Sequence, residues 1–396
     1  MLIQTPRELA RFCERLTGAR VICIDTEFAS EGRYYPDLGT IQIAGGIEIA
    51  LIDPLVVSDI SCFFRLLVDP DVVKVFHACA QDLEIFHRLS GRPVAPIFDT
   101  QIAAALLGYG DQISLRSLLQ ITLGEHLEKG HAFTDWLRRP LSSSQIEYAL
   151  NDVRYLGRSY EVLYKMLREA DRLEWAEEEF KLLETAERFL PIDERQAYTS
   201  LKGAERLTQP ALGLLQELVA WRELRARRLN VPPGRIAIDP VLMELAMRPP
   251  SSVRQLAQVR GLNSRQVGEY GAEIIEAIRR GARNVPPAIK PADPFPAALE
   301  ATVDFLSLCL RAVAREQSIS TGILANRSGL RSLVTLGETA HIPVLCGWRR
   351  QLVGTALLGA LQGEVAASIV GATKQVHLQW QRSNSTISGS ADCSDN

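Results

Sequence analysis

The sequence of 396 residues predicts an α/β domain followed by two small all-α domains. Up to residue 208, apolar runs rich in β-branched residues alternate with segments of helical periodicity, which is typical of an α/β domain. After residue 208 the strand-like runs stop, and apolar residues recur at helical spacing. The hydrophobic fraction of 46% is ample for the cores of about two to three domains.

The first domain, residues 1–208, is expected to hold four strands among seven helices. The second and third strands are separated only by the turn at Gly45 and Gly46, which predicts an antiparallel hairpin. The order of the other elements leaves parallel and antiparallel pairing undecided. The predicted strands are 21–27, 40–45, 48–52 and 72–77, and the predicted helices are 6–17, 58–68, 81–90, 99–107, 114–122, 142–167 and 173–186.

The second domain, residues 209–281, is expected to be a helical bundle broken by the Pro-Pro-Gly at 232–234. Five prolines in residues 282–297 predict a stiff linker. A second helical unit is expected over 298–380, and the small polar residues of 381–396 predict a disordered tail. After the break, the helices of the bundle are predicted at 240–247, 252–259 and 264–280.

Two carboxylates stand at the end of the first predicted strand. Asp25 and Glu27 follow the apolar run Val21 to Ile24. Because side chains alternate along a strand, both carboxylates are expected on one face of the sheet. Two like charges side by side repel each other unless a cation lies between them, so this pair is a candidate metal ligand set.

Three further residues extend the candidate set. Asp82 follows another strand-like run and begins a segment of helical spacing. Tyr148 and Asp152 are four residues apart in a predicted helix, which places them on the same helical face. Each pattern alone is ordinary, but two divalent cations about 3.5–4 Å apart need several oxygen ligands from different elements. The joint order and spacing therefore indicate one metal site.

These residues and their surroundings resemble the ribonuclease D family of the DEDD exonuclease superfamily, in the subclass whose last motif carries a tyrosine. The resemblance extends over nearly all of residues 20–160. Beyond the acidic residues, it is carried by Tyr34-Tyr35-Pro36, 38–42, 50–55, 98–101, Lys129, 135–137, 139–141 and 148–152. The segments 231–236, 245–246, 249–252 and 270–275 resemble the helicase-and-RNase-D C-terminal (HRDC) domain, and 320–325 stands at the equivalent place in a second, divergent copy.

The resemblance implies a ribonuclease H-like fold with a mixed sheet and an enzyme that removes 5′-mononucleotides from RNA 3′ ends. It implies two divalent cations, Mg²⁺ or Mn²⁺, held by Asp25, Glu27, Asp82 and Asp152, with Tyr148 orienting or deprotonating the attacking water. The expected substrates are tRNA precursors and other small structured RNAs. Two other functions stay open: a 3′–5′ DNA exonuclease, and a catalytically inactive RNA-binding scaffold.

Substrate contacts are expected at Thr26, Phe28 and Lys129. Phe28 follows the metal-binding strand and is expected either to stack on the terminal base or to pack in the core. Lys129 matches a basic residue of the family that contacts the scissile phosphate, although an exposed loop lysine would look the same. His77 is expected to be a packed residue at a strand end, because Mg²⁺ and Mn²⁺ prefer oxygen ligands.

Charge and cysteine content indicate the partners and the compartment. Residues 1–208 carry a net charge of −9 and residues 209–396 a net charge of +6, so the C-terminal half is expected to hold RNA. A basic stripe on one helix is predicted from Arg222, Arg225, Arg227 and Arg228. Seven cysteines without paired spacing predict reduced thiols. With no signal-peptide pattern and no long apolar run, a cytoplasmic monomer is expected.

Overall fold

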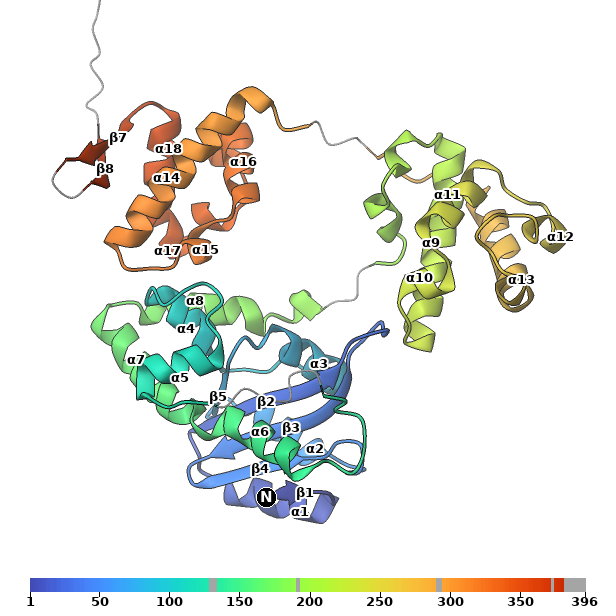
Figure 1. The fold of residues 1–396 in the computed structure, drawn as a ribbon. Coiled ribbons are helices and arrows are strands. Elements are labelled where there is room, and N and C mark those ends of the chain that lie inside the picture. The colour runs from blue at the N-terminus through green and yellow to red at the C-terminus, as the bar shows by residue number, and fades with distance from the viewer. Residues whose placement is uncertain (128–133, 190–192, 290–293, 372–373, 381–396) are drawn as a thin grey trace, which may run out of the picture.

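A computed structural model describes residues 1–127, 134–189, 193–289, 294–371 and 374–380. It contains one large sheet with helices around it, followed by two groups of helices and a small β-hairpin (Figure 1). The predicted α/β plus all-α class is therefore confirmed. Lys129 and the predicted tail at 381–396 lie outside the described residues.

The large sheet is mixed, in the strand order β1-β4-β3-β2-β5-β6. The β2–β3 and β3–β4 pairs are antiparallel, which confirms the predicted hairpin, whereas β2–β5 and β5–β6 are parallel. The edge strands β1 and β6 were not predicted, because two or three residues are too few to show a period. The strands are β1 (Leu2–Ile3), β2 (Val21–Ala29), β3 (Asp37–Gly45), β4 (Glu48–Ile52), β5 (Val73–Phe76) and β6 (Ile97–Asp99).

Eight helices surround this sheet in the described residues up to 189. The predicted single helix 142–167 is wrong: Tyr155 separates two helices, with φ −103° and ψ −8°. The break lets α6 cross β2, β3 and β4 while α7 packs on α4 and α5. The helices are α1 (Pro6–Arg15), α2 (Ser61–Leu67), α3 (Ala80–Ser90), α4 (Thr100–Leu106), α5 (Leu115–Leu123), α6 (Ser143–Arg154), α7 (Leu156–Glu169) and α8 (Leu173–Glu184).

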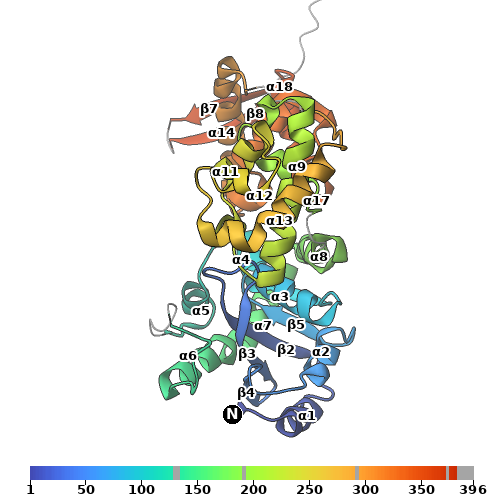
Figure 2. The ribbon, with the colours of Figure 1, turned by 90° about the vertical axis from the view of Figure 1, so that its right-hand side faces the viewer.

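The first C-terminal group of helices has a hydrophobic core of its own. Tyr198, Leu201 and Ala204 are buried in this core, although the predicted boundary at residue 208 assigned them to the first domain. The tip of α9 lies beside the loop between β2 and β3 (Figures 1 and 2), where the Tyr35 amide donates to Asn230 Oδ1 at 2.8 Å. The helices are α9 (Gln209–Leu229), α10 (Pro233–Ile236), α11 (Asp239–Met247), α12 (Val253–Leu256) and α13 (Ser264–Gly281).

The predicted basic stripe on α9 is wrong. Arg222 is buried and forms ion pairs with neighbouring carboxylates. Arg225 lies 3.6 Å from Glu273, and Arg227 lies 3.2 Å from a carboxylate of Glu194. Of the four arginines, Arg228 alone is exposed. Helical spacing identified a shared face but could not tell that most of this face is turned toward the protein.

The second group of helices is α14 (Glu300–Glu316), α15 (Thr321–Leu324), α16 (Arg327–Leu336), α17 (Gly347–Arg349) and α18 (Thr355–Leu361). The predicted helical unit over 298–380 also contains two strands that were not predicted, because β7 (Val365–Val370) and β8 (Gln375–Trp380) form an antiparallel hairpin at its end. Val365, Ile369 and Val376 show the β-branched content that such short strands favour.

The second group packs directly on the first domain, and the two share one continuous hydrophobic core. The rings of Trp175 and Trp348 stack with centroids 4.8 Å apart. Glu179 on α8 accepts from the Trp348 indole at 2.9 Å and from Arg349 Nη2 at 2.7 Å. This interface lies above α4 and α8 in Figure 1, so the two units form one body.

None of the described helices is long and apolar enough to cross a membrane. The six cysteines within the described residues are all free thiols, as the absence of paired spacing predicted.

Candidate active site

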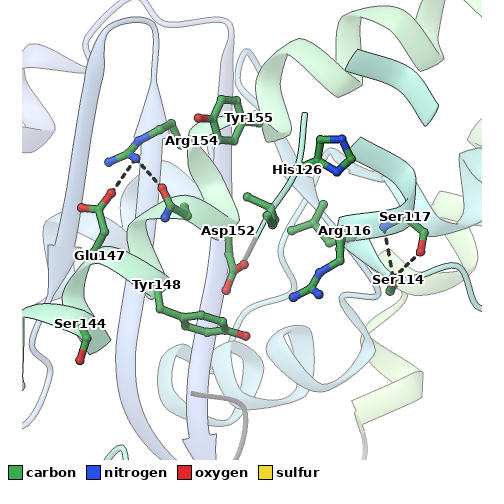
Figure 3. Close-up of a pocket in the computed structure, with 13 residues that line it drawn as sticks. Ser114, Arg116, Ser117, His126, Ser144, Glu147, Tyr148, Asp152, Arg154 and Tyr155 are labelled. Atoms are coloured by element: carbon green, nitrogen blue, oxygen red, sulfur yellow. Dashed lines mark hydrogen bonds and ion pairs between the residues drawn. The ribbon is translucent and has the colours of Figure 1, made fainter. Parts of the chain in front are cut away.

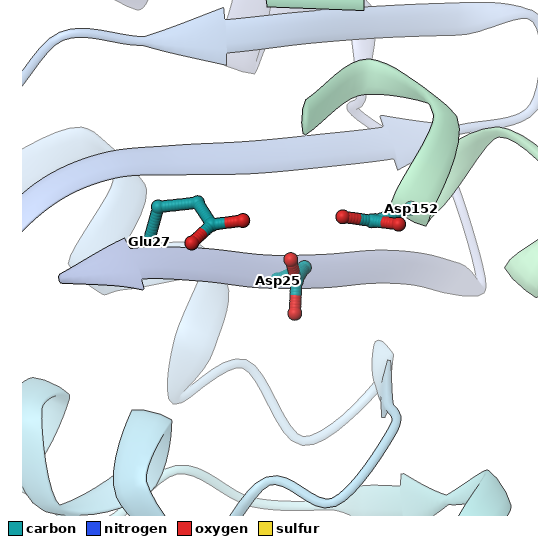
Figure 4. A group of neighbouring side chains, drawn as sticks. All are labelled: Asp25, Glu27 and Asp152. Carbon is teal, nitrogen blue, oxygen red and sulfur yellow. The ribbon is translucent and has the colours of Figure 1, made fainter. Parts of the chain in front are cut away.

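Strand β2 lies inside the sheet, between β3 and β5, and carries the first two candidate ligands. Asp25 pairs across the sheet with Gln42, and Glu27 pairs with Thr40. The β2–β3 register shifts between Glu27 and Phe28, and such irregularities often reorient side chains next to active sites. Figure 4 shows the Asp25 and Glu27 carboxylates on the side of the sheet where α6 lies.

Helix α6 brings Asp152 to this pair. Its first turn is fixed by a capping box, in which the Ser142 side chain accepts from the Gln145 amide and Gln145 bonds back to the Ser142 amide. One carboxylate oxygen from each of Asp25, Glu27 and Asp152 lies within 4.8 Å of the others (Figure 4). Three carboxylates from two elements therefore converge as the sequence predicted.

Asp82 lies in the first turn of α3 and is only 7% exposed. Its carboxylate accepts a hydrogen bond from the Thr26 hydroxyl. Burial first, and then the charge of Asp25, hold its pKa well above its usual range. Asp82 is not part of the three-carboxylate cluster. Its charge also raises the pKa of Glu27, so it lies near enough to the cluster to serve a second cation.

The pKa values show how crowded these acids are. Burial first, and then the charge of Asp152, hold the pKa of Asp25 well above its usual range. Burial and the neighbouring aspartates raise the pKa of Glu27 to about 9. Burial raises the pKa of Asp152 to about 7. Removing protons from such a group of acids costs free energy unless a positive charge compensates, and their oxygens are the donors that Mg²⁺ and Mn²⁺ prefer. The donor set therefore fits divalent cations.

Tyr148 precedes Asp152 by one turn of α6 and faces the same site. Its ring centroid lies 6.1 Å from that of Trp136. Burial raises its pKa above the ordinary phenol value, and so do the charges of Asp152 and Glu27, whereas the charge of Arg116 lowers it. Tyr148 is thus a neutral phenol in the cation-free protein.

A cavity of about 890 Å³ opens beside Tyr148 and Asp152, between α5 and α6. Figure 3 shows Arg116 on the α5 side, directed toward Asp152 and the Tyr148 hydroxyl. Sequence reasoning missed Arg116, because nothing in its local pattern distinguishes it from a surface arginine.

A second feature that sequence reasoning missed supports α6 from outside the site. Arg139 pairs with the buried Asp53 and also donates to the carbonyl oxygens of Gly39 and Trp136. A Cβ at position 39 would lie 2.8 Å from the Trp136 carbonyl oxygen, so the close approach requires glycine. Asp53 and Arg139 both occur in the family-like segments, but their pairing is visible only in the fold.

The remaining predicted residues are placed as follows. Thr26 is buried, and its hydroxyl donates to Asp82 rather than lying open. Phe28 is partly buried and packs against the main core. Their substrate contacts stay predictions. His77 is a packed residue, as expected: Nδ1 lies 2.9 Å from the Thr100 hydroxyl and Nε2 lies 2.9 Å from the Ile113 carbonyl.

Comparisons with known proteins agree with this geometry. Residues 1–168 match the family of 3′–5′ exonuclease domains, and residues 211–278 match the HRDC domain family. Ribonuclease D of Granulibacter bethesdensis is 37% identical over 386 residues, covering 95% of this chain and 96% of the relative. Ribonuclease D of Nitrobacter hamburgensis is 36% identical, covering 93% and 97%.

Solved structures point the same way. The crystal structure of Escherichia coli RNase D, described as an exoribonuclease involved in structured RNA processing, matches with a TM-score of 0.80. It is 29% identical in sequence, and the match covers 92% of this chain and 98% of that one. The catalytic core of RRP6 from Trypanosoma brucei, 21% identical with a TM-score of 0.56, shares the fold. The chain therefore belongs to the ribonuclease D family of 3′–5′ exoribonucleases.

Proposed function

We propose that this chain uses two divalent cations to hydrolyse RNA one nucleotide at a time from the 3′ end, releasing 5′-mononucleotides. The observation that carries the proposal is the convergence of carboxylate oxygens from Asp25, Glu27 and Asp152 within 4.8 Å, with the buried Asp82 close enough for its charge to act on Glu27. Asp25, Glu27 and Asp152 would hold one cation, and Asp25 with Asp82 would hold the other.

When bound, the cations would activate the attacking water and offset the charge that develops on the leaving 3′ oxygen. The four acids must then be ionised, so they give up the protons that burial and repulsion hold in the cation-free protein. In the cation-free protein, burial and the charges of Asp152 and Glu27 raise the pKa of Tyr148. Its hydroxyl would orient the attacking water by a hydrogen bond.

Structured RNAs, including tRNA precursors with 3′ extensions, are the substrates we propose. The similarity to the E. coli enzyme and the HRDC match at 211–278 support this class. Mg²⁺ and Mn²⁺ both suit an all-carboxylate site. A cytoplasmic monomer remains our proposal for the state and place of action.

One assay tests the function. RNA and DNA strands of equal length, labelled at the 5′ end, are incubated with Mg²⁺, Mn²⁺ or EDTA. We expect RNA to shorten from its 3′ end in single-nucleotide steps with either cation, and to stay intact in EDTA. Equal or faster cleavage of DNA would favour the DNA exonuclease alternative. Binding of RNA without cleavage under any condition would favour an inactive scaffold.

A further inference from the structure

The wall of the active-site cavity opposite α6 is formed by the first turn of α5. This turn is held in place by its cap, in which Ser114 Oγ accepts from the Ser117 amide at 3.2 Å. Arg116 is the second residue of the helix and is partly exposed on the cavity side. Its guanidinium is directed across the cavity toward Asp152 and Tyr148 (Figure 3).

The charge of Arg116 acts on the site itself. It lowers the pKa of Asp152 and of Tyr148, against the burial that raises both. A second arginine of the same cavity, Arg154, behaves differently. It donates to Glu147 at 2.8 Å and also to Asn151, so its charge is neutralised on α6. Arg116 thus directs positive charge at the reacting centre, whereas Arg154 does not.

The reaction needs such a charge. Four carboxylates would balance the charge of two cations, so a further positive group would help to stabilise the charge that grows on the phosphate under attack. Guanidinium is suited to this, because its planar set of donors matches two phosphate oxygens and it stays charged at every working pH.

We propose that Arg116 is a substrate-binding residue, whose guanidinium binds the phosphate of the 3′-terminal nucleotide during its removal. This inference rests on the proposed function and deepens it, since it assigns the α5 wall of the cavity to the scissile phosphate. A structural role is the competing explanation, in which Arg116 merely balances Asp152. The two roles make different predictions about how RNA affinity changes when the charge of one particular phosphate is removed.

The test combines a variant of the protein with a modified RNA. Short RNAs carry one methylphosphonate, which is uncharged, at the last, second-last or third-last linkage. Their affinities are measured in Ca²⁺, which replaces Mg²⁺ to slow hydrolysis. In the wild type, neutralising the last linkage should weaken binding about 10-fold, as expected for a lost charge-assisted hydrogen bond. In Arg116→Ala the same change should weaken binding about 5-fold less than in the wild type, because any effect of the cations on this phosphate is common to both proteins, while the other two linkages should have equal effects in both.

Catalysis gives a second measurement. Arg116→Ala should lower kcat/KM on an unmodified short RNA about 10- to 100-fold, with partial recovery in Arg116→Lys. Arg154→Ala, which removes the same charge from the same cavity, is the matched control and should change kcat/KM less than about 3-fold. The Mg²⁺ concentration for half-maximal activity is measured in parallel, because the Arg116 charge also acts on Asp152. Thermal unfolding confirms that each variant is folded.

Three outcomes would overturn the assignment. One is an equal loss for wild type and Arg116→Ala when the last linkage is neutral. Another is a shifted Mg²⁺ requirement in Arg116→Ala while the effect of the methylphosphonate on RNA affinity stays as in the wild type. That result would mean that Arg116 only balances the charge of Asp152. The third is an equal kcat/KM loss in Arg116→Ala and Arg154→Ala. If the wild type fails to hydrolyse RNA, the proposed function itself fails, whereas hydrolysis without the linkage effect removes only the role of Arg116.

Discussion

Arg139 forms a bidentate ion pair with the fully buried Asp53, with Nε–Oδ2 and Nη2–Oδ1 distances of 2.6 and 2.7 Å. The same guanidinium donates to the Gly39 and Trp136 carbonyl oxygens, at 2.7 and 2.8 Å. It thereby joins the end of β4, the strand β3 and the segment that leads into α6. Because α6 carries Tyr148 and Asp152, this ion pair outside the site helps to fix the position of two candidate catalytic groups.

Arg139→Ala should destabilise the protein by about 3–5 kcal/mol, because it leaves the Asp53 carboxylate buried and unpaired. Urea unfolding measures the loss. Arg158→Ala is the control, since its ion pair with Glu125 is largely exposed and should contribute less than about 1 kcal/mol. Equal losses in the two variants would mean that the Asp53 pair does not fix α6.

Asp25→Asn should lower RNA hydrolysis by more than about a thousandfold, as the loss of an essential catalytic group does. The variant keeps the side-chain volume but removes one charge from a ligand shared by both proposed cations. In EDTA it should unfold at a higher temperature than the wild type, because it removes the cost of burying the Asp25 carboxyl group and its repulsion with Asp152. Single-turnover hydrolysis and thermal unfolding are the two measurements. Normal turnover would disprove the assignment of Asp25 as a metal ligand.

Tyr148→Phe should lower turnover by orders of magnitude and leave the affinities for RNA and for the cation nearly unchanged. The ring still packs near Trp136, and only the hydroxyl that would orient the water is lost. Turnover is measured with saturating RNA, and affinity with Ca²⁺ present. A collapse of RNA binding at unchanged turnover per bound complex would instead make Tyr148 a residue that holds the substrate.

The cation-free protein should lose stability as the pH rises. Glu27 has a pKa of about 9 against 4.5 for the free side chain, and Asp152 has a pKa of about 7 against 3.8. An acid whose pKa is raised by folding contributes its full stability below the unfolded value, and that contribution is lost as the pH rises through the folded value. In EDTA the melting temperature should therefore fall between about pH 5 and pH 9.

Saturating Mg²⁺ should reduce this fall, because it favours the ionised acids. Glu27→Gln is the matched control and should flatten the upper part of the curve in EDTA. A melting temperature in EDTA that stays constant or rises from pH 5 to pH 9 would contradict the mutual repulsion described for these acids.

The sequence sufficed for the parts of the site that depend on local spacing. Asp25 and Glu27 share a face because they are two apart on a strand, and Tyr148 and Asp152 do so because they are four apart on a helix. Local spacing does not show which other elements pack against a given face of a helix or strand in the folded protein. For that reason Arg222, Arg225 and Arg227 were wrongly included in an exposed basic stripe for RNA, and Arg116 was not recognised.

The interface between α8 and the second group of helices contains a buried ion pair. Arg349 and Glu179 have side chains 9% and 10% exposed, and Glu179 also accepts from the Trp348 indole. Arg350, the next residue along the chain, pairs instead with the exposed Glu338 within its own group of helices.

Arg349→Ala should therefore destabilise the protein by about 3 kcal/mol or more, whereas Arg350→Ala should cost less than about 1 kcal/mol. The two substitutions are at adjacent positions and each removes one positive charge. The difference between their unfolding free energies therefore measures the contribution of the buried pair. Urea unfolding of both variants measures the difference. Because the two units share one core, Arg349→Ala should also keep a single unfolding transition. A separate early transition of the second group would show that the shared core does not couple the two units, and equal losses in both variants would show that the Glu179 pair does not hold them together.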